Sequence, residues 1–199
     1  MVDKALEAHE ARRLIEDSIR VWDAFLRLFH WGLVLAFALA YMSAEEHYGL
    51  HVWSGYAVLA LIALRLLWGF VGTRHARFAD FVAGPRRVSG YARAMLRGTP
   101  PRSTGHNPLG GWMVLALLTD LSIIALSGVA LDAAENRAGP LGGTRMFLYG
   151  DLIKHTHEIT TDLGLALIAL HMLGVAGSSW LHRENLVGAM ITGRKRKPD

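Results

Sequence analysis

Four long apolar blocks dominate the 199-residue sequence, and most of the charged residues fall between them. The blocks cover residues 28–42 (extended by Phe25 and Leu26), 52–71, 109–131 and 152–181, and Arg65 and Asp120 interrupt the second and the third. Each block is near or above the length of about 20 residues that a helix needs to cross a bilayer. An open sheet in lipid would leave backbone groups unpaired, so the pattern predicts an all-α protein with four transmembrane helices.

The segments between the blocks carry signals for caps and short helices. Asn107 and Pro108 are typical of the N-cap and first residue of a helix, here the third block. Within the loop 72–108, apolar residues between Gly/Pro breakers predict short amphipathic helices, and residues 146–149 predict a short interfacial segment in the loop 132–151. Residues 1–21 predict an amphipathic surface helix, with a solvated terminus as the alternative. Residues 22–181 then form the membrane domain, and residues 182–199 form a basic tail.

Lysine and arginine are distributed unevenly between the two sides of a membrane crossed four times. Residues 1–27, 72–108 and 182–199 hold five, seven and five of them, whereas residues 43–50 and 132–154 hold none and three. The positive-inside rule therefore places both termini in the cytoplasm. This topology accounts for the net charge of +4, and we expect no nucleic-acid partner. The acidic segment before the first block is unlike a signal peptide, so we expect that helix to be retained.

Four histidines lie inside or directly beside the apolar blocks, where ionisable residues mark functional sites, and their depths form two pairs. His30 lies one turn beyond Arg27, near the inner surface, whereas His51 opens the second helix, just before the second block, near the outer surface. His157 lies near the outer start of the fourth block. His171 lies 14 residues further on, about 21 Å along the helix and on the same face. We therefore pair His51 with His157 and His30 with His171.

Two imidazoles at each of two depths suit the axial ligands of two b-type haems, one near each membrane surface. A lone membrane histidine can instead bond a neighbouring helix, but four at matched depths favour ligation. A zinc or copper site would gather three or four ligands at one level. The sequence contains no cysteine, which excludes disulfides, iron–sulfur clusters and thioether-attached haem.

Glycines and arginines near the histidines are further candidates for the haem sites. Gly55 lies one turn from His51, and Gly164 lies midway between the histidines of the fourth block, where a missing side chain lets a macrocycle approach. Helix packing explains these glycines equally well. Arg65 and Arg27 are candidate partners for haem propionates, with snorkelling of Arg65 and interfacial anchoring of Arg27 as the alternatives.

Asp120 lies near the centre of the third block, where a carboxylate is costly. Two interpretations are open: a proton path, or a structural hydrogen bond to Ser122, Ser127 or Thr161, and we favour the second.

Several motifs resemble those of the bacterial cytochrome b561 family, whose superfamily includes the cytochrome b subunits of nickel–iron hydrogenases. They are R-L-F-H-W at residues 27–31, H-V-W-S-G at 51–55, R-L-L-W-G-F-V-G at 65–72 with R-F at 77–78, G-H-N-P-L-G at 105–110, and the spacing of His157 and His171. The resemblance extends from about residue 21 to residue 181. Asp120 departs from what we expect at its position.

The resemblance implies a four-helix bundle in the bacterial inner membrane, with two haems b inside. It would pass electrons between a periplasmic-side partner (a hydrogenase, a cytochrome c or a dehydrogenase) and the quinone pool, with ubiquinone as substrate. His106, Arg65 and His75 are candidate hydrogen-bond donors to the quinone. Two alternatives stay open: a stand-alone superoxide:ubiquinone oxidoreductase, which the few basic residues outside disfavour, and a haem-bearing membrane anchor of a larger complex. Whether the chain alone is an enzyme is also open.

Overall fold

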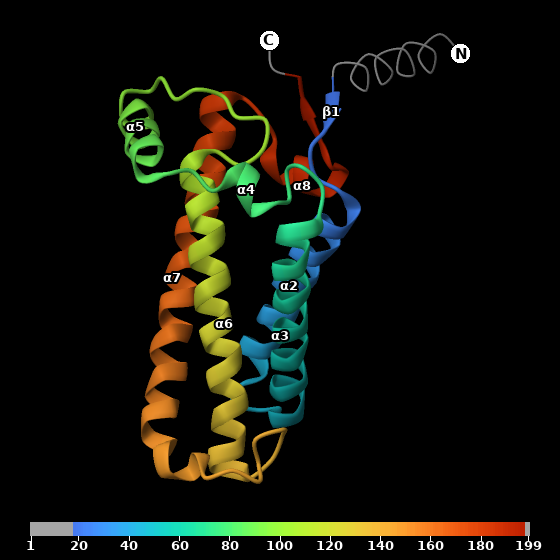
Figure 1. Cartoon of the computed structure of the whole chain (residues 1–199), viewed down its shortest axis with the longest axis vertical. Helices are drawn as coiled ribbons and strands as arrows, with labels where there is room; N and C mark the ends of the chain where they lie inside the picture. Colours follow the sequence, from blue (N-terminus) through green and yellow to red (C-terminus); the bar gives the residue numbers. More distant parts are fainter. Residues whose placement is uncertain (1–17, 198–199) are drawn as a thin grey trace, which may run out of the picture.

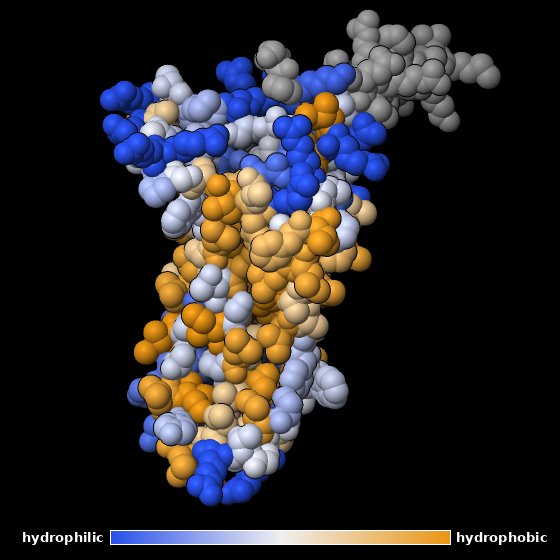
Figure 2. All heavy atoms as spheres, in the orientation of Figure 1, coloured by the Kyte–Doolittle hydropathy of each residue, from blue (hydrophilic) through white to orange (hydrophobic). Residues whose placement is uncertain are grey.

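The computed structural model describes residues 18–197, and four long helices form its body (Figure 1). Helices α2 (Ala24–Ser43), α3 (Tyr48–Val71), α6 (Pro108–Asn136) and α7 (Gly150–His182) contain the four apolar blocks. All four are long and apolar enough to cross a membrane. Figure 2 shows the resulting apolar band between two hydrophilic ends. The protein is therefore a multi-pass membrane protein, and the prediction of four spanning helices is confirmed.

The long helices pack as two antiparallel pairs, α2 with α3 and α6 with α7 (Figure 1). Helix α3 joins the pairs by packing on α6, where Val58 and Ile62 meet Leu121 in a buried cluster. Helix α7 packs chiefly on α6, and Gly164 is its one fully buried residue. Most of the surface of α7, including residues flanking its histidines, is therefore not covered by the other helices.

Polar caps fix where two of the long helices begin. The side chain of Asn107 accepts a hydrogen bond of 2.7 Å from the backbone N–H of Gly110, and Pro108 is the first residue of α6, as the sequence predicts. Asp23 caps α2 and also accepts hydrogen bonds from Trp68 and Thr73 at the end of α3. Burial raises the pKa of the Asp23 carboxyl, but its hydrogen bonds together lower the pKa by more than burial raises it. The net pKa therefore lies below its ordinary value.

Short elements cover one end of the bundle, and we call them together the cap. They are α4 (Phe78–Phe81), α5 (Pro85–Leu96), α8 (Leu186–Thr192), β1 (Ser18–Arg20) and β2 (Arg194–Arg196). The opposite end carries a 3₁₀ helix, η1 (Met146–Tyr149). We refer to the two ends as the cap end and the η1 end. The predicted short helices in the loop 72–108 and the short segment at residues 146–149 are confirmed.

The first described residues form a strand instead of the expected helix. Strand β1 pairs with β2 in antiparallel register, with Ser18 opposite Arg196 and Arg20 opposite Arg194. The prediction of an amphipathic helix over residues 1–21 is therefore wrong for residues 18–20, because a partner strand from the other end of the chain supplies their hydrogen bonds. Residues 1–17 lie outside the described residues.

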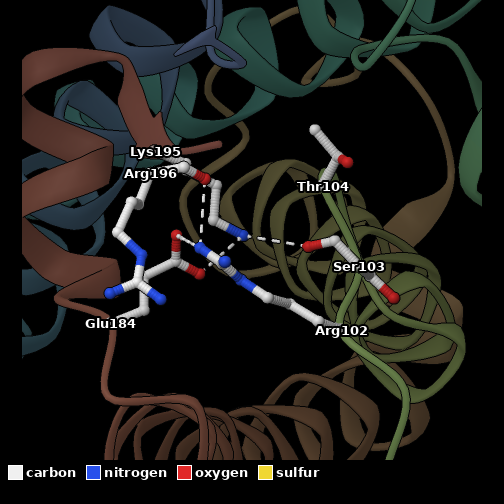
Figure 3. Close-up of a pocket in the computed structure, with 6 residues that line it drawn as sticks. All are labelled: Arg102, Ser103, Thr104, Glu184, Lys195 and Arg196. Atoms are coloured by element: carbon white, nitrogen blue, oxygen red, sulfur yellow. Dashed lines mark hydrogen bonds and ion pairs between the residues drawn. The ribbon is translucent and has the colours of Figure 1, made fainter. Parts of the chain in front are cut away.

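An ion-pair cluster ties three distant segments of the cap end together (Figure 3). Glu184, which follows α7, lies 3.2 Å from the guanidinium of Arg102 and 3.2 Å from the ammonium of Lys195 in β2. Arg102 also donates to the carbonyls of Arg196 and Lys197, and Lys195 donates to the carbonyl of Ser103. The cluster joins the loop before α6 to the end of α7 and to β2.

Candidate functional site

His51 and His157 face each other at the η1 end, from α3 and α7. Their ring centres are 6.2 Å apart, and the ring planes are inclined at 83°. A metal ion held between two imidazoles, about 2 Å from each ligating nitrogen, separates the ring centres by about 6 Å. This pair therefore has the spacing of two ligands on opposite sides of one metal ion.

Backbone carbonyls orient both of these imidazoles. Nδ1 of His51 lies 2.9 Å from the carbonyl oxygen of Ala40 in α2, and Nδ1 of His157 lies 3.0 Å from that of Ile124 in α6. A carbonyl only accepts hydrogen bonds, so each Nδ1 carries the proton and each Nε2 keeps a lone pair. This is the arrangement that holds a metal-ligating histidine in place.

The sequence did not point to the residues that make this support. Ala40 and Ile124 contribute only backbone carbonyls, and no side-chain pattern signals such a role. Gly128 on α6 also faces the site, since a Cβ there would lie 3.1 Å from Cε1 of His157. Ser127 adds a hydroxyl 3.1 Å from Nδ1 of the same histidine. The sequence contains Gly128 and Ser127, but it does not reveal that they face this site.

His30 and His171 come from α2 and α7 toward the cap end, and they are close enough to interact electrostatically. Nδ1 of His30 is buried and has no hydrogen-bond partner within residues 18–197. The structure thus brings His51 and His157 together and places His30 within electrostatic range of His171, but His30 lacks the backbone support that both members of the first pair have.

Buried cationic groups without a hydrogen-bond partner lie at the cap end. Arg65 is only 1% exposed, and both of its terminal nitrogens lack a partner among the described residues. Its guanidinium lies 5.1 Å from the ring centre of Phe78 and 5.8 Å from that of Phe81. Nε of Arg27 is also unpartnered in the same part of the chain, although its Nη1 donates to the carbonyl of Ile191. A buried unpaired guanidinium is costly, so this region fits an anionic group.

The snorkelling interpretation of Arg65 is wrong. A snorkelling side chain keeps its charged head in water, whereas the guanidinium of Arg65 is buried against the rings of α4.

The two candidate glycines have different surroundings. A Cβ added to Gly55 would meet nothing within 4 Å, so open space lies beside this residue. A Cβ added to Gly164 would lie 2.8 Å from Oδ2 of Asp120 and 3.1 Å from Ile124. Gly164 therefore lets α6 approach α7, which is the packing alternative for this residue.

Asp120 makes none of the hydrogen bonds expected from the sequence. The hydroxyls of Ser122, Ser127 and Thr161 bond the carbonyls of Leu118, Ile124 and His157 instead. Neither carboxylate oxygen of Asp120 has a hydrogen-bond partner in the described part of the chain, and the side chain is 4% exposed. The structural hydrogen bond favoured for Asp120 is therefore wrong, because helix carbonyls already occupy the three hydroxyls.

At the cap end, His106 lies within electrostatic range of both Arg65 and His75. The His106 ring contacts the tilted rings of Trp22 and Phe81, with ring centres 4.7 and 4.9 Å away. Burial, reinforced by the nearby charge of Arg65, lowers the pKa of His106 to about 3. Burial also lowers the pKa of His75. The imidazole of His106 is therefore neutral at physiological pH.

Four apolar helices that present histidine pairs at two ends define a membrane protein suited to holding metal groups at two depths. Residues 21–193 match the family model described as prokaryotic cytochrome b561. The chain belongs to the prokaryotic cytochrome b561 family, and this confirms the resemblance seen in the sequence. Family membership implies b-type haem and electron transfer within the membrane.

Two similar proteins are each named "Probable Ni/Fe-hydrogenase B-type cytochrome subunit". The chain is 22% identical to the protein from Rhizobium leguminosarum bv. viciae, over 96% of this chain and 94% of the relative. It is 25% identical to the protein from Azotobacter vinelandii, over 96% and 95% of the two chains. No solved structure is significantly similar to the chain.

Proposed function

We propose that this protein carries electrons across the bacterial inner membrane, through two b-type haems, between a periplasmic-side redox partner and the quinone pool. His51 and His157 would hold the outer haem, and His30 and His171 would hold the inner haem. The observation that carries this proposal is the 6.2 Å separation of the His51 and His157 rings, each with Nε2 free to bind. The haems supply the redox chemistry when bound, and the protein supplies ligands, spacing and surrounding charge.

The unpartnered cations at the cap end support an inner haem, because they would hold its propionates. Arg65 is the principal propionate partner, because both terminal nitrogens are buried and available. Arg27 is the second, through its buried Nε. Charge-assisted hydrogen bonds to carboxylates would satisfy donors that the described chain leaves unpaired. Gly55 leaves open space beside the outer ligands, and Gly164 holds α7 close to α6 between the two haems.

The topology follows from the charge distribution. The cap end carries the basic segments 72–108 and 182–199, so it faces the cytoplasm and both termini lie there. The η1 end, with the loop 132–151, faces the periplasm. Residues 22–181 are the haem-bearing membrane domain, flanked by the cytoplasmic segment 1–21 and the basic tail.

The partner on the periplasmic side is a hydrogenase in this proposal, because two relatives that align over nearly their full length are described as hydrogenase cytochrome subunits. The quinone binds near the cap end. His106, His75 and Arg65 lie there, and Nδ1 of His106 is a buried nitrogen without a partner among the described residues. A neutral imidazole both donates and accepts, which suits the carbonyl and hydroxyl forms of a quinone.

A pyridine haemochrome assay with protein quantitation tests the proposal. We expect two haems b per chain in the unmodified protein, and one each in His157→Ala and His171→Ala. His155→Ala is the matched control, because His155 lies two residues from His157 with a side chain that is 78% exposed, and it should keep two. Protein that binds no haem when haem is abundant, or a His157→Ala variant that keeps both haems, would refute the ligand assignment.

A further inference from the structure

Asp120 is a buried carboxylate without a hydrogen-bond partner at the centre of the bundle. It is 4% exposed, and both oxygens lack a partner within the described residues. Oδ2 is directed at α7, where a Cβ on Gly164 would come within 2.8 Å of it. The glycine thus makes room for the carboxylate, and the electron-transfer function proposed above does not use this group.

The depth of Asp120 is midway between the two histidine pairs. Gly164, which faces it, is seven residues from His157 and seven from His171. Seven residues of α-helix rise about 10 Å, so the carboxylate lies at about that distance along the bundle from the level of each pair.

The other ionisable groups on the packed helices lie toward the two ends or on another face. On the neighbouring helices these groups include His30 on α2, His51 and Arg65 on α3, and His157, Glu158 and His171 on α7. Asp162 is also on α7, at nearly the depth of Asp120, but it is exposed. The charge state of Asp120 is therefore governed by its apolar surroundings and by whatever charge develops at the levels of the histidine pairs.

A charge change at those levels acts strongly on a buried carboxylate. An electron that enters either level adds one negative charge about 10 Å from Asp120. At the effective dielectric constant of protein interiors, this changes the proton affinity of the carboxylate on the order of tenfold. The added electron favours the neutral form, because the apolar interior and the new charge both oppose a second anion.

We propose that Asp120 is a proton-binding site coupled to the redox state of the protein. When a one-electron donor adds an electron at the level of either histidine pair, Asp120 would take one proton from water, so that an O–H bond of water breaks and an O–H bond forms on the carboxylate. When that electron leaves to the acceptor, the proton would return to water. Each cycle thus moves one electron and one proton together, and the net charge of the bundle interior is unchanged. This inference rests on the proposed function, since it needs haems at the two histidine pairs.

Redox titration at several pH values tests this inference in the purified, haem-loaded protein. We expect the midpoint potential of at least one haem to fall as pH rises, because reduction includes proton uptake. Asp120→Asn should reduce that slope, whereas Asp162→Asn, the same change at nearly the same depth on an exposed position, should keep it. Redox-difference infrared spectra should show the carbonyl stretch of a protonated carboxyl in the reduced protein. This band should shift in D₂O and disappear in Asp120→Asn.

The outcomes separate this inference from the function on which it rests. Haem content is measured first, and protein without two haems refutes the proposed function. A two-haem protein whose potentials do not change with pH, or an Asp120→Asn slope equal to the unmodified one, overturns only the proton site. If Asp120→Asn does not fold with its haems, the infrared spectra of the unmodified protein and of Asp120→Glu test the inference. The carboxyl band should appear in both at different positions, and its absence from the unmodified protein overturns the inference.

Discussion

His51 and His157, at the η1 end, each hydrogen-bond a backbone carbonyl of a neighbouring helix, whereas His30, at the cap end, has a buried Nδ1 without a partner in residues 18–197. Buried cationic nitrogens of Arg27 and Arg65 are also unpartnered at the cap end, again within the described chain. The neighbouring helices thus orient both imidazoles of the pair at the η1 end. His30, at the cap end, lies near donors that need an anionic group, so in our proposal a bound haem would complete this end of the fold as well as use it.

The two ends also differ in what covers them. The cap encloses its end with ion pairs, aromatic contacts and a strand pair, and Phe81 of α4 packs against the ring of His106. The η1 end has one 3₁₀ helix and a hydrogen bond from Tyr48 to Asp132. Changes at the cap end should therefore affect both stability and the inner haem, whereas changes at the η1 end should have local effects.

The largest effect is expected from Arg65→Ala. Removal of the guanidinium leaves propionates without their cation in an apolar interior, so the inner haem should be lost or weakly held while the outer haem stays. Haemochrome content together with the potentials of the remaining haem measures this. Arg137→Ala, which removes an arginine that lies over the ring of Phe147 at the η1 end, is the control and should keep two haems. Equal loss of both haems in Arg65→Ala would contradict the assignment to one end.

Glu184→Gln should loosen the cap without removing a haem ligand. The carboxylate is 9% exposed and holds Arg102 and Lys195, and hydrogen bonds to charged groups contribute about 1.5–3 kcal/mol. We expect a loss of that size in the free energy of unfolding, measured by thermal or denaturant unfolding in detergent. An unchanged stability would mean that the cluster in Figure 3 does not hold the cap.

Gly111→Ala should separate α4 from α6. A Cβ at this position would lie 2.5 Å from the backbone carbonyl oxygen of Phe81, so α4 must move, and overpacking of this kind costs about 1–3 kcal/mol. Gly90→Ala, in α5 with nothing within 4 Å of the added Cβ, is the control and should stabilise by about 0.5–1 kcal/mol. Unfolding curves of the two variants should shift in opposite directions.

The acid sensitivity of the cap end should depend on His106. Its pKa is about 3 in the folded protein against an ordinary value of 6.5, so between these values the unfolded chain binds a proton that the folded protein does not. Stability is therefore complete above pH of about 6.5 and decreases as pH falls toward 3. His106→Phe should flatten this part of a plot of melting temperature against pH, and His155→Phe should not.

The smallest effect is expected at the η1 end, from Tyr48→Phe. It removes the hydrogen bond to Asp132 and should cost about 0.5–1.5 kcal/mol of unfolding free energy, with two haems retained. A larger loss than that of Glu184→Gln would reverse the comparison between the ends.

Much of the fold was predictable because the bilayer restricts it so strongly. Apolar runs long enough to span must become helices, and the Asn107–Pro108 cap and the short segment at residues 146–149 follow from local residue chemistry. The histidine pairing also followed from helix direction and rise alone. The structure brings these side chains together, and their role as haem ligands stays a prediction.

The remainder depended on contacts between segments far apart in the sequence. The partner of β1 lies about 176 residues away, so no local pattern could reveal the strand pair. The orientation of Asp120 toward Gly164 depends on how α6 and α7 pack, and the serine and threonine hydroxyls nearby suggested partners that helix carbonyls had already taken. Asp162 lies within a long apolar block, and the sequence pattern there does not indicate that its side chain is exposed.

The pairing of β1 with β2 sets the order in which the molecule can be completed. A ribosome makes β1 before the first membrane helix and β2 after the last, so β1 has no partner until all four helices have been synthesised. The two strands can therefore pair only in a chain that carries every membrane segment. A truncated product that stops before Arg194 would lack β2, so β1 would stay unpaired, in a form that quality-control proteases can recognise.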